Sequence, residues 1–168
     1  MGCDIHCYSE TRIGNKWVAD EAHTFSEEPC TWSEDEDNTE LDMDEFDVGG
    51  RNYWLFALFA GVRGEMPWSF EPKGFPADSS KEVARLFESW DCDAHTPSWL
   101  TQQELADKYA ELVKRHPILK IELLLLDDSS AMADAMQDNI EELEKILNKL
   151  RHPDHAAEHR RLVFWFDN

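Results

Sequence analysis

The closing segment Arg161-Leu162-Val163-Phe164-Trp165-Phe166 is rich in apolar and aromatic side chains and favours a β-strand. A strand this apolar at the very end of a chain must be central in its sheet. The simplest arrangement pairs it with the strand-like segment CDIHCYSETR, which begins at Cys3. The sequence therefore predicts a small, mainly antiparallel sheet that joins the two ends of the chain.

A hairpin extends this sheet on the N-terminal side. The segment KWVAD (16–20) follows the first strand across Ile13-Gly14-Asn15-Lys16, and Gly and Asn both tolerate the positive φ of tight hairpin turns. A length of 168 residues suits one domain better than two. We expect a single α+β domain over residues 1–168, with several helices covering one face of the sheet.

Two helices are expected before residue 91. The segment WLFALFAGV, which starts at Trp54, favours a short buried helix with a stop at Gly61. A second helix is expected near Ser80 to Trp90, with Ser79 or Ser80 as its N-cap.

A polar, proline-containing stretch separates these helices from the next one. Residues 91–100 are expected to form a loop, because Pro97 and its polar neighbours break any periodic pattern. Thr101 and Glu104 have the spacing of a capping box, so a helix is predicted from there to about Arg115, before Pro117.

Residues 118–151 contain an apolar run followed by a long amphipathic pattern. The apolar run 118–126 fits a strand or a helix, and we favour a helix. A helix over about 129–151 is predicted by apolar residues at the helical period, which we expect to pack in the core rather than in a coiled coil. These residues are Met132, Met136, Ile140, Leu143, Leu147 and Leu150.

Charge is the strongest compositional feature. The chain has 16 basic and 36 acidic side chains, a formal net charge of −20. This charge repels nucleic-acid phosphates and attracts basic protein surfaces or cations, although a solvated acidic surface can also serve solubility alone. We expect a protein partner with a basic surface and no direct nucleic-acid binding.

The acidic side chains are concentrated in one segment. Residues 17–50 contain no Lys or Arg and thirteen Asp or Glu. We expect residues 21–48 to form a flexible acidic insert. We assign candidate partner-binding roles to seven acids of this region. They are Glu34, Asp35, Glu36, Asp37, Asp42, Asp44 and Glu45.

The sequence also bears on the cellular compartment. It has neither the pattern of a signal peptide nor a run of roughly twenty apolar residues, so we expect a cytoplasmic protein without a membrane association. The four cysteines form no C-x-x-C pair, and we expect reduced thiols, with Cys3 and Cys7 in the core.

Two Asp-x-His pairs are the candidate metal ligands. Asp4 and His6 are spaced so that a strand directs both to one face, where they could bind one divalent ion. Asp93 and His95 form a second pair in the expected loop. The first pair could equally be an exposed or hydrogen-bonded pair, and convergence of the two pairs is not encoded in the spacing.

Further residues could complete a ligand site around these pairs. Arg51 offers a planar fork for a phosphate or carboxylate, or it could form a salt bridge with the acidic insert. Packing is the alternative role for Trp99. The candidate ligand-binding residues are Arg51, Tyr53, Ser98, Trp99, Asp167 and Asn168.

Several of these motifs carry a resemblance to a known family. The start MGCDIH, Arg51-Asn52-Tyr53 with LFALFAGVRG, GFPADSS, Asp93-Ala94-His95 with SWLT, and the closing VFWFDN resemble a widespread family of bacteriophage and prophage proteins of unassigned function. The resemblance implies a phage accessory protein that acts inside an infected bacterium. It implies no particular fold, reaction or ligand.

Two functions remain open at this stage. The first is a phage counter-defence inhibitor whose acidic surface occupies a basic, nucleic-acid-binding face of a host defence complex. The alternative is a metal-dependent hydrolase, or a binder of a phosphorylated small ligand such as a nucleotide signal, built on Asp4, His6, Asp93 and His95. A divalent metal ion is the candidate cofactor of this second function.

Overall fold

The computed structural model describes residues 2–20, 43–64, 66–124 and 130–167. Its strands are β1 (Ile5–Ile13), β2 (Lys16–Ala19), β3 (His95–Thr101) and β4 (Arg160–Phe166). Its helices are α1 (Tyr53–Ala60), α2 (Lys81–Ser89), α3 (Gln102–Leu124) and α4 (Ser130–Leu150), and a 3-10 turn, η1 (Ala157–His159), precedes β4. No helix of these described segments is long and apolar enough to cross a bilayer.

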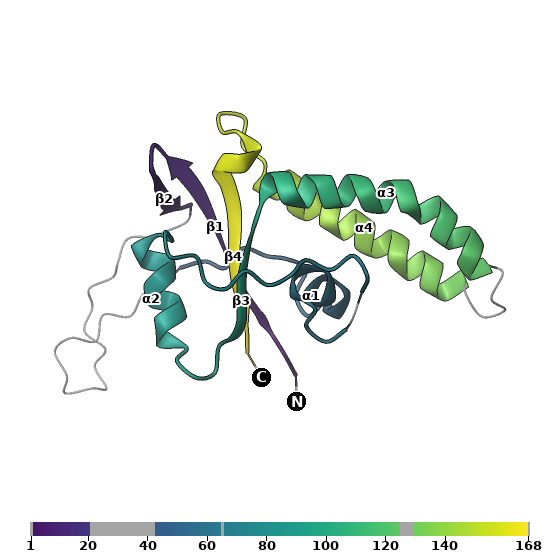
Figure 1. Cartoon of the computed structure of the whole chain (residues 1–168), viewed down its shortest axis with the longest axis horizontal. Coiled ribbons are helices and arrows are strands. Elements are labelled where there is room, and N and C mark those ends of the chain that lie inside the picture. The colour runs from purple at the N-terminus through teal and green to yellow at the C-terminus, as the bar shows by residue number, and fades with distance from the viewer. Residues whose placement is uncertain (1, 21–42, 65, 125–129, 168) are drawn as a thin grey trace.

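The sheet joins the two ends of the chain. Its strand order is β2-β1-β4-β3, and every neighbouring pair is antiparallel. Ile5 lies opposite Phe166 and Thr11 lies opposite Arg160, so the whole of β4 pairs with residues 5–11 of β1. Both ends of the chain emerge at the same edge of the molecule (Figure 1). The predicted α+β fold with a small antiparallel sheet is confirmed.

β4 is buried on both of its faces. Leu162, Phe164 and Phe166 belong to one core cluster with residues of α1, α3 and α4, whereas Val163 and Trp165 pack with residues of α2. Figure 1 shows α2 on one side of the sheet and the other three helices on the opposite side. The expectation that helices cover one face was therefore wrong, because the odd and even positions of β4 are both apolar and each set needs a cover.

Local sequence explains where α1 and α2 begin and end. The side chain of Asn52 accepts hydrogen bonds from the backbone N–H groups of Trp54 and Leu55, at 3.1 and 3.2 Å, and α1 ends at Gly61, whose φ is 68°. The hydroxyl of Ser80 accepts from the N–H of Val83 at the start of α2. These predicted helices and their stop and start residues are confirmed.

The capping box at the start of α3 is also confirmed. The N–H of Thr101 donates to the Glu104 carboxylate at 2.9 Å, and the N–H of Glu104 donates to the Thr101 hydroxyl at 3.1 Å. α3 does not end before Pro117, however, but continues to Leu124, so the predicted end near Arg115 was wrong. A proline removes one helical hydrogen bond, and the helical residues on both sides of it outweigh that loss here. The helix favoured for 118–126 is confirmed as far as Leu124.

The expected loop 91–100 contains the edge strand β3, which is a second correction. Pro97 lies between His95 and Ser98, where the pairing with β4 shifts register, and Thr96 there has a φ of 48°. An edge strand with a bulge tolerates a proline because the missing N–H interrupts no continuous ladder. The predicted helix at 129–151 is confirmed as α4, and of the acidic insert only residues 43–48 lie inside the described segments.

A buried ion pair joins β1 and β4 on the α2 side of the sheet. Nε of Arg161 donates to Glu10 at 2.7 Å, and both side chains are excluded from solvent. The other carboxylate oxygen of Glu10 accepts from the hydroxyl of Ser79 and from the backbone N–H of Ser80, at 2.8 and 2.7 Å. Because Ser80 is the N-cap of α2, this one carboxylate holds the helix against the sheet.

We predict that Arg161→Met lowers the free energy of unfolding by about 3–5 kcal/mol, because it leaves the Glu10 carboxylate buried without its cation. Glu10→Gln combined with Arg161→Met keeps an oxygen acceptor for Ser80 and removes the charge, so it should recover most of that loss. Urea unfolding of the three proteins is the measurement. A double variant as unstable as Arg161→Met alone would show that charge burial is not the cause.

Candidate functional site

The two faces of β1 separate the residues of the MGCDIH motif. Cys3, Ile5 and Cys7 are buried in the core with α1, α3 and α4, and Tyr8 is buried in the core with α2. This is the alternation that the strand pattern predicts, and the thiols of Cys3 and Cys7 are free and buried as expected. His6 therefore lies on the α2 side, near the edge where the chain ends meet.

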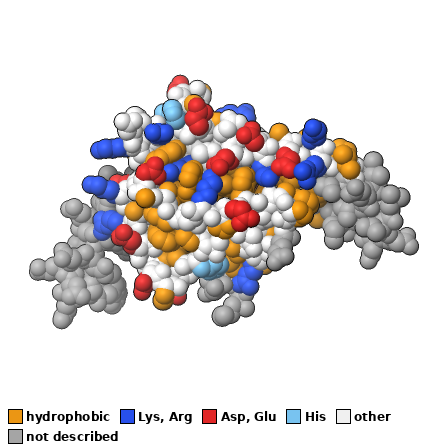
Figure 2. All heavy atoms as spheres, in the orientation of Figure 1, with side chains coloured by type: hydrophobic (Ala, Val, Ile, Leu, Met, Phe, Trp, Pro, Cys, Tyr) orange, Lys and Arg blue, Asp and Glu red, His pale blue; other side chains and the backbone are white. Residues whose placement is uncertain are grey.

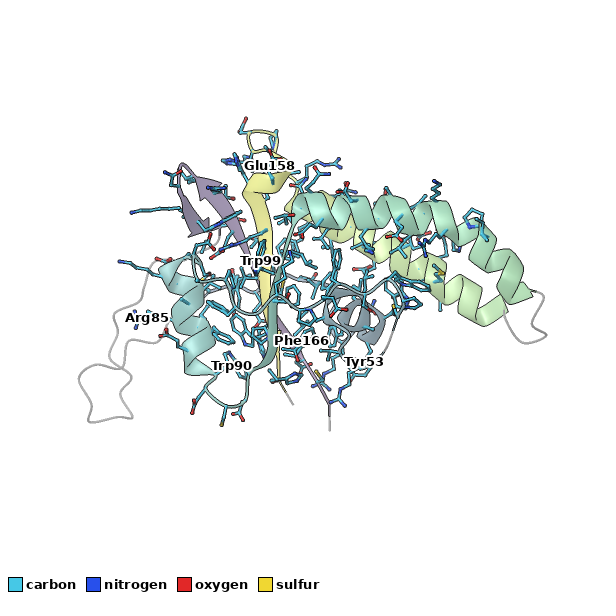
Figure 3. The ribbon with its side chains drawn as sticks, in the orientation of Figure 1. Tyr53, Arg85, Trp90, Trp99, Glu158 and Phe166 are labelled. Carbon is cyan, nitrogen blue, oxygen red and sulfur yellow. The ribbon has the colours of Figure 1, made fainter. Side chains whose placement is uncertain are left out.

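His6 is held between two carboxylates and an indole. Its Nδ1 lies 2.6 Å from Oε1 of Glu45, and its Nε2 lies 3.5 Å from Oδ2 of Asp167, an ion-pair distance rather than a well-formed hydrogen bond. Its ring packs on Trp90, with 4.0 Å between ring centroids. Trp90 lies at the end of α2 (Figure 3). Only 12% of the side chain is exposed, so the imidazole is a fixed part of this cluster.

The segment 43–48 brings Glu45 to His6. The N–H of Phe46 donates to the carbonyl of Cys7 at 2.6 Å, and Met43, Phe46 and Val48 are buried. β2 pairs only with residues 10–13 of β1, and this segment lies along the part of β1 that β2 leaves unpaired. The end of the acidic insert is thereby docked on the sheet.

Asp4 and Arg51 form the second pair at this edge. The Arg51 guanidinium donates from Nε and Nη2 to the two carboxylate oxygens of Asp4, the latter at 2.6 Å. This hydrogen bonding to Arg51 holds the pKa of Asp4 below its usual value. The backbone N–H of Asp4 also donates to Asp167 at 2.9 Å. Arg51 thus pairs with the N-terminal motif, and the alternative pairing with acids of residues 21–42 falls outside the described residues.

These residues surround a groove of about 390 Å³. Its polar lining comprises His6 and Arg51 together with the carboxylates of Asp4, Glu45 and Asp47, and Ile5, Phe46 and Val48 supply apolar lining. Asp167 adds a further carboxylate within reach of His6. Carboxylates outnumber the guanidinium, whose fork is already held by Asp4, so the groove suits a cationic group better than a phosphate.

The second Asp-x-His pair does not join this groove. The ring of His95 stacks on Phe166, with 5.9 Å between centroids, and its Nδ1 lies 3.0 Å from the hydroxyl of Thr96. Phe166 belongs to the core cluster opposite to that of Trp165, so His6 and His95 lie towards different faces of the sheet. Asp93 is exposed. Across the described residues, no group of three or more His, Cys, Asp or Glu side chains is arranged to hold a metal ion.

Ser98 and Trp99 have packing partners of their own. The buried hydroxyl of Ser98 accepts from the N–H of Lys73 at 3.1 Å. The Trp99 ring lies beneath the Lys73 ammonium, 3.8 Å from the centroid, and the guanidinium of Arg161 lies 5.5 Å from the same centroid. Neither residue lines the groove around His6. For Trp99, the packing role is the one that the geometry supports.

Some of the remaining candidates lie in the described parts of the chain, and the others lie outside them. Tyr53 begins α1, is 41% exposed, and places its ring 5.5 Å from that of Phe56. Asp44 and Glu45 are the described members of the partner-binding set. Outside the described residues lie Glu34, Asp35, Glu36, Asp37, Asp42 and Asn168.

Two contacts of the site were missed by the sequence analysis. Trp90 was assigned only to a helix end, and its stacking on His6 has no spacing pattern that predicts it. Glu45 was assigned to partner binding, and its contact with His6 spans 39 residues of chain. Short-range spacing cannot reveal contacts that depend on how distant segments pack.

Surface charge outside the groove is mixed on the face shown in Figure 2. Acidic and basic side chains alternate there with apolar ones, and no single acidic patch dominates that face. The groove around His6 is a place where carboxylates of several described segments meet.

The chain has no match among protein-family models, curated proteins or solved structures. Its function has to be argued from the geometry and charge of the site.

We predict that His6 makes stability depend on pH. Burial favours its neutral form, but the hydrogen bond with Glu45 and the charges of Glu45 and Asp167 outweigh burial and raise the pKa of His6 above 6.5. Protonated His6 therefore stabilises the fold fully below about pH 6.5 and loses this contribution as pH rises through the folded-state pKa. Urea unfolding of the wild type and His6→Phe should differ by about 1 kcal/mol at most, with the difference shrinking at higher pH.

The control for this prediction is His159→Gln, which removes an exposed histidine at the far end of β4. It should leave the pH profile of stability unchanged, whereas Glu45→Gln should flatten the profile as His6→Phe does. A wild-type advantage over His6→Phe that stays constant from pH 5.5 to 9 would contradict a charged His6.

Proposed function

We propose that this protein is an acidic binding protein that occupies a basic surface of a protein partner. In the setting that the family resemblance implies, it is a phage counter-defence inhibitor in the cytoplasm of an infected bacterium. Its partner is then a host defence complex, and the basic surface is the face by which that complex binds nucleic acid.

The observation that carries the proposal is the excess of carboxylates at the groove around His6. Asp4, Glu45, Asp47 and Asp167 lie there with two cationic groups: Arg51 is paired with Asp4, and His6, where protonated, is paired with Glu45 and Asp167. Carboxylates still outnumber cations at the groove. A lysine or arginine of a partner would find carboxylates there, whereas a phosphate would meet repulsion. Segment 43–48, which supplies Glu45 and Asp47, is continuous with the most acidic part of the sequence.

The net charge of −20 acts over a longer range than the groove. Charge complementarity steers a basic partner into contact and raises the association rate, and salt weakens this effect because exposed charges are screened beyond about 8 Å at physiological ionic strength. Nucleic-acid phosphates are repelled by the same field. A protein of this charge can therefore take the place of nucleic acid on a basic face without binding nucleic acid itself.

A bait experiment tests the proposal. The seven candidate acids from Glu34 to Glu45 are replaced by their amides, and the wild type and this variant are used to capture proteins from host extract. We expect the wild type to retain a host protein that salt elutes, and we expect the amide variant to lose at least about tenfold of that capture, since several charge pairs are removed together.

The control variant removes the same amount of charge elsewhere. It neutralises seven acids that are exposed on other parts of the molecule and should keep most of the capture. These acids are Glu71, Glu88, Asp91, Asp107, Asp138, Asp154 and Glu158. Capture that survives in the first variant, or that falls equally in both, would reject a specific acidic surface at residues 34–45.

A further inference from the structure

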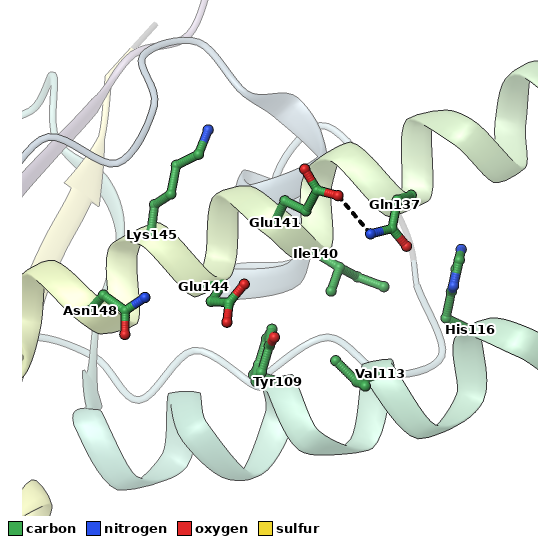
Figure 4. Close-up of a pocket in the computed structure, with 9 residues that line it drawn as sticks. All are labelled: Tyr109, Val113, His116, Gln137, Ile140, Glu141, Glu144, Lys145 and Asn148. Carbon is green, nitrogen blue, oxygen red and sulfur yellow. Dashed lines mark hydrogen bonds between the residues drawn. The ribbon is translucent and has the colours of Figure 1, made fainter.

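A second groove lies between α3 and α4, away from the groove around His6. It has a volume of about 420 Å³, and Tyr109 and Val113 on α3 and Ile140, Glu141 and Glu144 on α4 line it. Figure 4 shows these side chains converging from two helices that run side by side. The helix pair projects beyond the sheet in Figure 1.

The floor of this groove is partly apolar and open to solvent. Val113 is 44% exposed, and Ile140, which lies across from it, is buried beneath the groove. The lining residues of α4 run from Gln137 to Asn148, which corresponds to roughly 16 Å, or three helical turns. Tyr109, Val113 and Ile140 supply the apolar part of this lining, and the rest is polar. A hollow of this length between two helices, with an apolar strip and polar sides, can accept one further amphipathic helix.

Charge decides which kind of helix fits. Glu141 and Glu144 stand along the groove, and the one ammonium of its lining, Lys145, lies 2.8 Å from Glu142. Glu141 is held only by the amide of Gln137, at 2.7 Å, among the hydrogen bonds of the described residues. The Tyr109 hydroxyl hydrogen-bonds to Glu144. Among the described residues neither Glu141 nor Glu144 is in an ion pair, so both carboxylates keep their charge for cations of an occupant.

Other occupants are disfavoured by the net charge of the chain. A second copy would bring a further charge of −20 to the same place, and an anionic membrane surface would be repelled for the same reason. A helix with basic flanks is attracted by the long-range field and matched by the carboxylates at close range.

We propose that the α3–α4 groove docks a basic amphipathic helix of a protein partner. Apolar side chains of that helix lie over Val113 and Ile140, and its lysines or arginines pair with Glu141 and Glu144. This surface is separate from the groove around His6, and the proposal does not depend on what the latter binds.

The probe is a synthetic helical peptide of about 18 residues with a leucine stripe and Lys or Arg flanks. Its binding to the full chain is measured by fluorescence anisotropy at 0.15 M salt. We expect Val113→Asp to weaken binding by about tenfold or more, because it places a charge in the apolar floor. Glu141→Gln with Glu144→Gln should also weaken it.

The matched control is Ile118→Asp, which changes an exposed apolar residue of the same helix that does not line the groove. Both aspartate variants add the same charge at solvent-exposed positions, so a difference between them reports the groove itself. We expect Ile118→Asp to bind as the wild type does, and a peptide with Glu in place of its basic residues to bind at least tenfold more weakly.

Three results would overturn this proposal. One is that the Val113→Asp and Ile118→Asp variants bind the basic peptide equally. Another is that the wild type binds the basic and acidic peptides equally, or binds neither peptide. The third is a dimer of the wild type in sedimentation that Val113→Asp disrupts, which would assign the groove to a second copy.

Discussion

The double-sided burial of β4 is the constraint on which the rest of the structure depends. Its apolar side chains alternate between two cores, and burial of each large one contributes roughly 1.5–3 kcal/mol. Helices on one face of the sheet alone would leave about half of these side chains exposed to water. The chain therefore surrounds the strand, with β1 and β3 as neighbours, α1, α3 and α4 on one side and α2 on the other. Phe46 and Val48 pack in the first core, and Met43 packs in the core with α2.

The two arginines at the start of β4 connect these layers. Arg161 reaches Glu10 and, through it, the N-terminus of α2. Arg160 donates to the carbonyl of Leu150 at the end of α4 and pairs with Asp20 after β2. Polar groups in such positions have to be satisfied, so each arginine fixes one helix end relative to the sheet. The groove around His6 lies at the opposite end of the same strand.

Sequence reasoning succeeds here where structure is local. The Gly61 stop of α1, the Ser80 cap of α2 and the Thr101 capping box follow from patterns a few residues long. The pairing of the two ends is long-range, and it was predicted because both ends are strand-like and the last is strongly apolar. Sequence reasoning failed at β3, because the bulge that accommodates Pro97 exists only beside β4. It failed again at the second face of the sheet, although the apolar residues at every position of 162–166 carried that information.

The candidate site shows the same division between local and long-range information. Asp4 and His6 were identified from their spacing, and Arg51 and Asp167 from their chemistry, and all four meet at one edge. Their joint charge was not predictable, because it depends on Glu45 and Asp47 arriving with segment 43–48. That charge favours a cationic partner over a phosphorylated ligand.

Zero-length carboxyl-to-lysine cross-linking of the wild-type chain in host extract tests this central claim most directly. We predict that carboxylates of segment 34–47 join to lysines of one host protein, and that this protein no longer binds nucleic acid in the cross-linked complex. Cross-links scattered over many proteins, or a cross-linked partner that still binds nucleic acid, would contradict it.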